Sequence, residues 1–537
     1  MSEGDKGGVM KGSSSPPSPD KEVLARSPSK IVVSFLASPI TLIGFGILLR
    51  TVQYAANPSL WVDESALALN IIQRTYAGLF QPLDYGQAAP VGFLLLEKFV
   101  SLQLGIGEYA LRLVPFLSGV ASLFLFHALA KRCLVREAVP WALFLFAIAS
   151  PLVYYSSELK QYSSDVFITL VILLAGIHAR EKNLALFSVA MFGAAGAVGI
   201  WFSQPATFVA GGVALALVVS CVARKDWGGA GIAGLAGALF LLSFGAEYHF
   251  LIRNIRLDHF LEFWSRDLMP FPPTSPWHLL WIWETFILLF LFPMGLALKG
   301  LGAFSFLCGV LSMLKRNRDT LFILFFPAFV TIVASALQRY PLRGRLVLFL
   351  APFLAILMAE GIRQVFEMDR AKRLSAGVLF VVLLFLQPLA DAAVNARYPE
   401  EARSQLGHSE EVRPVLLYIR DHWQERDLIY VFSSSEDAFR YYSLLLRADF
   451  LEVIIGANLR KDFENTYRKE LDQLCGRGRV WVLFSHVGGD RGKSVNVESM
   501  VGYLETLGKR RDQVRHSGAF AYLFDLTASS EKGMQEK

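Results

Sequence analysis

Long apolar blocks, broken by short loops that hold most of the charge, constrain this sequence more than any other feature. Each block runs for about 17–22 residues, which lets a helix cross a hydrocarbon core roughly 30 Å thick. Of the 537 residues, 54% are hydrophobic and 18% are charged, whereas soluble domains have about 25% charged residues. We therefore predict a polytopic α-helical membrane protein with about eleven transmembrane helices.

Eleven blocks have the length and composition of a membrane span. They are 31–49, 111–130, 138–155, 163–179, 184–202, 205–223, 228–246, 294–314, 320–337, 344–362 and 374–390. Residues 1–29 are rich in Ser, Pro, Gly and charge, and bury too little apolar surface to fold. The sequence thus predicts a disordered tail at 1–29 and a transmembrane domain at 30–390.

The Lys and Arg residues predict which side of the membrane each loop occupies. With an odd number of spans, five basic clusters fall on the side of the basic N-terminal tail: 131–136, 180–182, 224–225, 315–318 and 370–373. Short loops rich in Lys and Arg are usually cytoplasmic. We expect a multi-pass protein of a bacterial inner (plasma) membrane with a cytoplasmic N-terminus. These clusters also account for the formal charge of +6, so no nucleic-acid partner is expected.

Three longer segments then face away from the cytoplasm: loops at 50–110 and 247–293, and the C-terminal region 391–537. In the C-terminal region, predicted helices and strands alternate: helix 411–424, strand 427–432, helices 436–446 and 460–474, strand 479–484, helix 497–507 and strand 519–525. Such alternation is typical of layered α/β domains. We expect a small extra-cytoplasmic (periplasmic or extracellular) α/β domain.

Asp63 and Glu64 form the first of four polar clusters on the predicted outer face, where charge is costly and needs a reason. They precede an amphipathic stretch at 64–80, so Asp63 fits a helix N-cap with Glu64 in the first turn. The functional alternative makes Asp63 a general base, because a positioned carboxylate can remove a proton from an acceptor hydroxyl.

The second cluster contains Gln87, Glu97, Lys98, Glu108 and Arg112. Arg112 follows Glu108 by four residues, so an ion pair along one helix gives it a structural role. Glu97 and Lys98 fit the membrane interface. A substrate contact is the functional alternative for Gln87 and Arg112.

The third cluster fills the connection between two predicted spans, at 154–165. It holds two carboxylates, one Lys, one Gln and three Tyr hydroxyls, whereas a hairpin loop needs only a few turn residues. Glu158 and Tyr162 would share one helical face, and Gln161 and Asp165 another. A self-satisfied polar turn and the lining of a substrate cavity both fit.

The fourth cluster places Arg339, Arg343 and Arg345 on the outer side, against the usual distribution of positive charge. Arginine side chains match phosphate groups well, and a lipid phosphate would lie at this depth. The alternative is a general attraction to membrane-lipid headgroups.

Together the clusters predict a carboxylate base and a phosphate-binding cation on one face of a helical bundle. Group transfer from a lipid phosphate to a hydroxyl fits these groups. In glycosyl transfer from a polyprenyl monophosphate, the phosphate leaves readily. The protein then has to supply a base for the acceptor and positive charge for the departing phosphate.

The sequence resembles the GT-C fold glycosyltransferases that use polyprenyl-phosphate sugars. These include protein O-mannosyltransferases, the aminoarabinose transferase of lipid A and galacturonosyltransferases of rhizobial lipopolysaccharide core. The resemblance covers about 31–390 and rests on these motifs: Asp63-Glu64, Gln87-x-x-Pro90, Glu108-x-x-x-Arg112-x-x-Pro115, Tyr155-x-x-Glu158-x-Lys160-Gln161-Tyr162-x-x-Asp165, and Tyr340-Pro341 with Arg345.

The resemblance implies that Asp63 is the catalytic base of an inverting transfer, and that Arg345, helped by Arg343, binds the donor phosphate. The other motif residues are expected to bind substrates: Glu64, Gln87, Arg112, Glu158, Lys160, Gln161, Tyr162 and Asp165. The implied partners are a polyprenyl-phosphate sugar donor, a glycan, lipid or protein acceptor, and membrane lipids. Some relatives bind a divalent metal through Glu and His, but the outer-side histidines have no clear ligand spacing: His249, His259 and His278.

Two other functions remain open from the sequence. A flippase or transporter of a lipid-linked sugar would show repeats and polar groups near the bilayer midplane, but here the polar groups gather at one face. A membrane-anchored envelope assembly protein would use its C-terminal domain for recognition. That second function leaves the outer-loop clusters unexplained.

Overall fold

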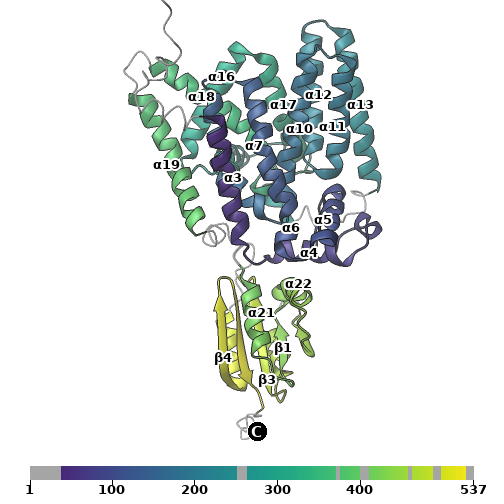
Figure 1. Cartoon of the computed structure of the whole chain (residues 1–537), viewed down its shortest axis with the longest axis vertical. Coiled ribbons are helices and arrows are strands. Elements are labelled where there is room, and N and C mark those ends of the chain that lie inside the picture. The colour runs from purple at the N-terminus through teal and green to yellow at the C-terminus, as the bar shows by residue number, and fades with distance from the viewer. Residues whose placement is uncertain are drawn as a thin grey trace, which may run out of the picture.

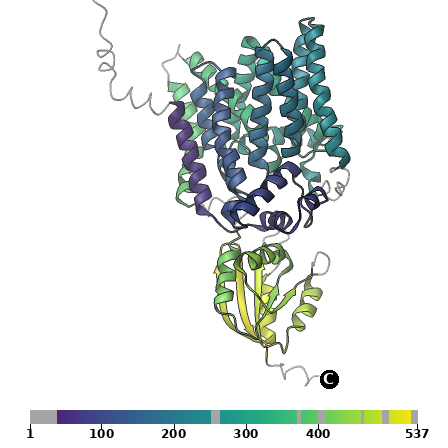
Figure 2. The same ribbon diagram turned by 45° about the vertical axis from the view of Figure 1, so that its right-hand side comes forward.

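The computed structural model describes residues 38–250, 263–369, 375–398, 410–457, 463–487 and 497–527. A bundle of long helices forms the larger part, and a smaller domain with a β-sheet lies beyond one end of it (Figure 1, Figure 2). Short helices lie across that end, between the bundle and the sheet domain (Figure 1). The predicted architecture, a polytopic helical protein with a small C-terminal α/β domain, is confirmed.

Each of the eleven predicted spans corresponds to a helix in the described ranges. Eight are long and apolar enough to cross a membrane: α3 (Pro39–Ala56), α7 (Leu113–Cys133), α10 (Tyr162–Glu181), α12 (Ala206–Ala223), α13 (Trp227–Phe250), α17 (Arg318–Ala336), η5 (Gly344–Leu350) continued by α18 (Ala351–Asp369), and α19 (Ser375–Arg397). The span predicted at 138–155 is a bent pair, in which α8 (Val139–Ile148) meets α9 (Ser150–Tyr154) and η2 (Tyr155–Ser157) at 58°, the geometry of a broken span or a re-entrant loop. The remaining two are α11 (Leu186–Phe202), which is 17 residues long, and α16 (Lys299–Arg316), which has basic residues at both ends.

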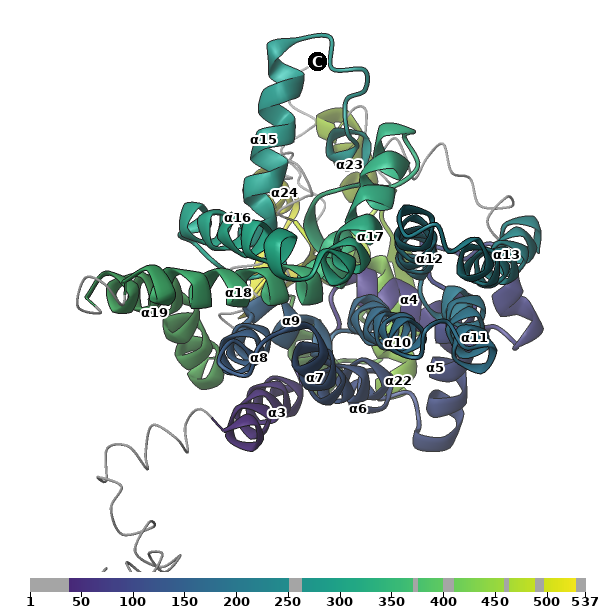
Figure 3. The ribbon, with the colours of Figure 1, turned by 90° about the horizontal axis from the view of Figure 1, so that it is seen from above.

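Two predicted boundaries are wrong. The first span was expected at 31–49. Residues 31–37 lie outside the described part of the chain, and the described helix α3, capped by the Ser38 side chain through the Thr41 amide at 3.2 Å, continues to Ala56, beyond the expected end. The segment 247–293 was expected to be a loop, yet it contains α15 (Pro276–Leu291), an apolar helix. Viewed along the bundle, α15 projects outward from the other helices (Figure 3).

Four of the five basic clusters that predicted the orientation meet at one end of the bundle, and the fifth, at 370–373, lies outside the described residues. Arg316 donates a hydrogen bond to the Cys133 carbonyl, and Arg180 donates to Thr320. Arg224 pairs with Asp319 beside them. This end lies opposite the short helices and the sheet domain, because α7 and α10 both run from the short-helix end to the basic end.

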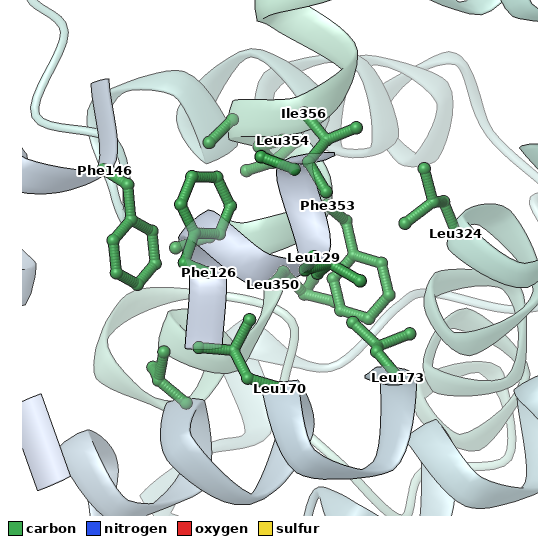
Figure 4. Packing of buried hydrophobic residues seen from close by; sticks show 14 of the residues in the cluster. Phe126, Leu129, Phe146, Leu170, Leu173, Leu324, Leu350, Phe353, Leu354 and Ile356 are labelled. Carbon is green, nitrogen blue, oxygen red and sulfur yellow. The ribbon is translucent and has the colours of Figure 1, made fainter. Parts of the chain in front are cut away.

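Apolar side chains from several helices fill the centre of the bundle. Figure 4 shows this packing around Phe126, Phe146, Leu170 and Phe353. The closest approach joins α16 to α18, where a Cβ added to Gly361 would lie 1.7 Å from the Ser305 carbonyl oxygen. Small residues allow such close contact between membrane helices.

The C-terminal domain has a five-stranded sheet in the order β2-β1-β3-β5-β4. Its elements are α21 (Val412–Asp421), β1 (Leu428–Val431), α22 (Glu436–Leu446), β2 (Glu452–Ile455), α23 (Phe463–Asp472), β3 (Arg479–Ser485), α24 (Val497–Leu507), β4 (Lys509–His516) and β5 (Ala519–Asp525). β1 pairs in parallel with β2 and β3, while β5 runs antiparallel to β3 and β4. The edge strands β2 and β4 were not predicted. β2 is only four residues long, and β4 has a single apolar residue, Val514.

A continuous apolar cluster joins this domain to the short helices of the bundle. These helices are α4 (Val62–Gln73), η1 (Ala77–Phe80), α5 (Val91–Leu104) and α6 (Glu108–Leu111). Buried residues of α4, such as Leu67, pack in the same cluster as Tyr441 and Tyr442 of α22 and Leu416 of α21. The sheet domain is therefore docked on the end of the bundle by a shared core.

Candidate active site

Asp63 and Arg345 form an ion pair at the end of the bundle that faces the sheet domain. The Arg345 Nη2 atom lies 2.5 Å from the Asp63 Oδ2 atom, although 282 residues separate them in sequence. Asp63 belongs to the first turn of α4, and Arg345 to the first turn of η5. The two side chains keep 24% and 17% of their surface exposed, so both remain accessible to a substrate.

Asp63 is not the N-cap of its helix. Trp61 occupies the N-cap position, and the Glu64 carboxylate accepts a hydrogen bond from the Trp61 amide at 3.4 Å. The Asp63 carboxylate therefore does not cap the helix and instead accepts a hydrogen bond from Arg345. The interpretation of Asp63 as the helix N-cap is therefore wrong.

Lys160 is the second cation of the site. It lies in the turn between η2 and α10, is almost fully buried, and donates from Nζ to the Gln87 side chain at 2.6 Å. Burial alone would raise the pKa of Asp63, but Lys160 and then Arg345 outweigh burial and hold that pKa well below its usual range. Burial lowers the pKa of Lys160, and Asp63 opposes this shift. Asp63 is consequently ionised at neutral pH.

Aromatic rings surround the Arg345 guanidinium. Its central carbon lies 5.4 Å from the ring centre of Trp61 and 5.8 Å from those of Tyr162 and Trp264. The buried Nε atom of Arg345 has no hydrogen-bond partner among the described residues. Since buried donors are normally paired, this N–H is available to an anionic ligand.

Glu64 and Arg112 lie behind this cluster as a buried pair. Arg112 donates to the Glu64 carboxylate from Nε at 2.8 Å and from Nη2 at 2.7 Å, and both side chains are at most 1% exposed. Glu64 also accepts from the Leu159 amide at 2.7 Å. The expected ion pair between Arg112 and Glu108 is wrong, because Glu108 instead pairs with Arg413 of the sheet domain at 2.7 Å. Their burial favours a supporting role for Glu64 and Arg112 over the predicted substrate contact.

The rest of the third cluster is buried around the site. Glu158 accepts from the Trp61 indole at 2.9 Å, which links it to the aromatic surround of Arg345. Tyr162 contributes its ring to that surround. Gln161 and Asp165 are buried at the start of α10 and each has one side-chain oxygen without a partner in the described part of the chain.

Arg343 is held away from Asp63 by α15. It donates to the Thr285 hydroxyl at 2.8 Å, lies 4.5 Å above the Trp281 ring and pairs with Glu284 at 3.6 Å. These contacts occupy the guanidinium, so they favour a role in attaching α15 rather than the predicted help in phosphate binding.

The described residues hold no group of three or more His, Cys, Asp or Glu side chains able to ligate a metal ion. His249 and His278 lie in the described part of the chain, and His259 lies outside it.

Some contributors to the site were not predicted from the sequence. Trp61 stands two residues before Asp63, and its nearness to a candidate base was the available signal. Trp264 lies in a distant loop and carried none. Residues of the C-terminal domain that contact the segment before Asp63 also gave no sequence signal, because about 350 residues separate the partners.

Comparisons with known proteins bear on the fold. No protein-family model and no curated protein matches the sequence. The crystal structure of ArnT from Cupriavidus metallidurans in the apo state superposes with a TM-score of 0.52 at 15% identity, covering 88% of this chain and 96% of that one.

Two further structures were found at lower scores. ArnT bound to undecaprenyl phosphate gives 0.47 at 14% identity, covering 93% of this chain and 98% of that one. The archaeal oligosaccharyltransferase AglB from Archaeoglobus fulgidus, in complex with an inhibitory peptide and a dolichol-phosphate, gives 0.48 at 12% identity, covering 93% and 75%. The likeness to apo ArnT confirms that this chain has the GT-C-like fold that the sequence predicted.

Proposed function

We propose that the protein is an inverting glycosyltransferase that moves a sugar from a polyprenyl-phosphate donor to a hydroxyl acceptor. The observation that carries this proposal is the Asp63–Arg345 pair at 2.5 Å, with Lys160 beside it, at one end of a helical bundle. It supplies the two groups that the reaction needs, a carboxylate base and a cation for the leaving phosphate.

In the proposed reaction, Asp63 takes the proton of the acceptor hydroxyl while the hydroxyl oxygen attacks the anomeric carbon of the donor sugar. A new carbon–oxygen bond forms as the bond from that carbon to the phosphate oxygen breaks. Polyprenyl phosphate leaves with the electron pair, and Arg345 and Lys160 stabilise its added negative charge. Attack from the face opposite the phosphate inverts the anomeric centre.

The ion pair also explains how Asp63 becomes a useful base. In the resting protein, Lys160 and Arg345 keep Asp63 ionised but make it a weak base. A donor phosphate would take over Arg345, including its unpaired Nε–H. The pKa of Asp63 then rises toward the range in which it can accept a proton from the acceptor.

The distribution of charge supports a periplasmic site in a bacterial inner membrane. The basic loops gather at the end of the bundle opposite Asp63, and such loops are usually cytoplasmic. In this proposed orientation, the domain at 391–537 and the loop at 50–110 lie in the periplasm. ArnT, which shares the fold, is described bound to undecaprenyl phosphate, and this agrees with a polyprenyl-phosphate donor here. The acceptor in this proposal is a glycan, a lipid or a protein of the cell envelope.

The test is transfer by the purified protein from a panel of radiolabelled polyprenyl-phosphate sugars into membrane extracts. Wild-type protein should form labelled product with one donor, and Asp63→Asn should form none while inserting normally. Asp84→Asn is the matched control, because Asp84 pairs with Arg74 at 2.7 Å at the same end but is 65% exposed. Undiminished transfer by Asp63→Asn would refute the proposed mechanism. Lipid-linked sugar flux across vesicles without product would favour a flippase.

A further inference from the structure

The segment that leads into Asp63 is held by the C-terminal domain. We call residues 57–62 the strap; they comprise the connection from α3 to α4 and Val62, the first residue of α4. The Ser59 amide donates to Glu411 at 3.2 Å, the Leu60 amide to the Tyr442 hydroxyl at 2.6 Å, and the Val62 amide to Glu410 at 3.1 Å. Three of four consecutive strap amides are therefore bonded to side chains of the C-terminal domain.

The fourth amide and the strap carbonyls are bonded as well. The Trp61 amide donates to Glu64, and Arg112 donates to the Pro58 carbonyl at 2.6 Å. The Asn57 carbonyl accepts from Arg413 of the C-terminal domain at 2.8 Å. A loop usually bonds its backbone to water or to nearby turns. This strap is instead fixed on both sides by side chains from elsewhere in the chain.

From these contacts we infer that Glu410, Glu411 and Tyr442 are positioning residues for Asp63, and that the C-terminal domain completes the active site rather than serving only to recognise a partner. This inference rests on the proposed function. Glu410 bonds the residue directly before Asp63, at the first turn of α4. A carboxylate there also interacts favourably with the positive end of the helix dipole.

Packing supports the same conclusion. α22 carries Tyr442 and packs along α4 through the shared apolar cluster, and Tyr442 also donates to Glu108 at 3.0 Å. Glu411 bonds the Ser59 hydroxyl at 2.8 Å in addition to its amide. Because catalysis depends on placement of the base, a shift of about 1 Å can cost on the order of 100-fold in rate. Loss of these bonds should therefore slow the chemical step more than it weakens substrate binding.

The experiment combines hydrogen exchange with transfer kinetics in the full-length protein. Glu410→Ala and Tyr442→Phe each remove one strap bond, whereas Glu410→Gln keeps an oxygen that can accept from the Val62 amide. The matched control is Glu452→Ala on β2, which breaks an exposed ion pair with Arg477. Exchange is followed on peptides that cover the strap, and kcat and KM are measured with the radiolabelled donor that wild-type protein uses.

We expect Glu410→Ala and Tyr442→Phe to exchange strap amides at least tenfold faster and to lower kcat by about 10- to 100-fold. The donor KM should change little, and Glu410→Gln should restore most of kcat. Normal exchange of the strap amides in both variants would refute the claim that the C-terminal domain holds the strap. Faster exchange with normal kcat would refute the positioning role of these residues. A raised acceptor KM with unchanged kcat would assign the domain to acceptor binding instead. Absence of transfer by wild-type protein would refute the proposed function. Hydrogen exchange would still show whether the C-terminal domain holds the strap.

Discussion

The buried Glu64–Arg112 pair should be indispensable to the stability of the outer end of the bundle. Replacing Glu64 with Leu leaves the Arg112 guanidinium enclosed, and among the described residues its remaining hydrogen-bond partners are the Pro58 and Ser59 carbonyls. It also removes the acceptor of the Leu159 amide, in the turn that carries Lys160. Buried charges that lose their partner are costly, because water cannot solvate them.

The size of the effect follows from the bonds that are lost. Glu64 accepts three short hydrogen bonds, at 2.8, 2.7 and 2.7 Å. At about 1.5–3 kcal/mol for each bond to a charged group, their sum sets an upper limit of roughly 4.5–9 kcal/mol. Removal of one member of a buried ion pair typically costs about 3–5 kcal/mol. We expect the free energy of unfolding to fall by that smaller amount.

The assay is denaturant titration of the purified protein in mixed micelles, followed by tryptophan fluorescence. Asp84→Ala, which breaks an exposed pair at the same end, should cost no more than about 1 kcal/mol. The double variant Glu64→Leu/Arg112→Met should recover much of the loss, since no unpaired charge remains. A loss below about 1 kcal/mol for Glu64→Leu alone would refute the reasoning.

Two further predictions concern packing and pH. Gly361→Ala should lower folded yield and thermal stability, because its Cβ would lie 1.7 Å from the Ser305 carbonyl oxygen and force α16 away from α18. The expected cost is about 1–3 kcal/mol or more. Unchanged stability in a thermal melt would contradict this close contact. Burial, and secondarily Glu436, raises the pKa of Asp437 to about 6. The Asp437 carboxyl therefore contributes most to the free energy of unfolding at low pH, and this contribution is lost as the pH rises from about 4 through 6. Asp437→Asn should therefore exceed wild type in stability by a larger margin at pH 7.5 than at pH 4.5, and a pH-independent difference in denaturant titrations would count against it.

Much of the bundle was predictable from the sequence, because length and hydrophobicity alone specify membrane helices. The span expected at 205–223 is found as α12 at Ala206–Ala223. The end of the first span was placed at 49 because Arg50 interrupts the apolar run, whereas α3 buries Arg50 and continues to Ala56. α15 was missed because, at 16 residues, it is shorter than a typical membrane span and lies in the segment 247–293 that was expected to be a loop.

The candidate site was only partly predictable. Charges at the outer face pointed to Asp63, Lys160 and Arg345, since such groups need a reason to be there. The ion pairs of the outer face were not predictable from sequence spacing. Arg112 was expected to pair with its neighbour Glu108, but in the fold it pairs with Glu64. Contacts between the strap and the C-terminal domain also join residues about 350 positions apart. They depend on tertiary packing, which one sequence does not encode in any local pattern.

The most direct test is binding of undecaprenyl phosphate to the purified protein and two variants. If Arg345 binds the phosphate and Asp63 competes with the phosphate for Arg345, then Arg345→Gln should weaken binding at least tenfold, or about 1.4 kcal/mol. Asp63→Asn should bind as tightly as wild type or tighter, because its removal frees Arg345 and Lys160. Wild-type affinity in Arg345→Gln, or equal weakening in both variants, would contradict the account.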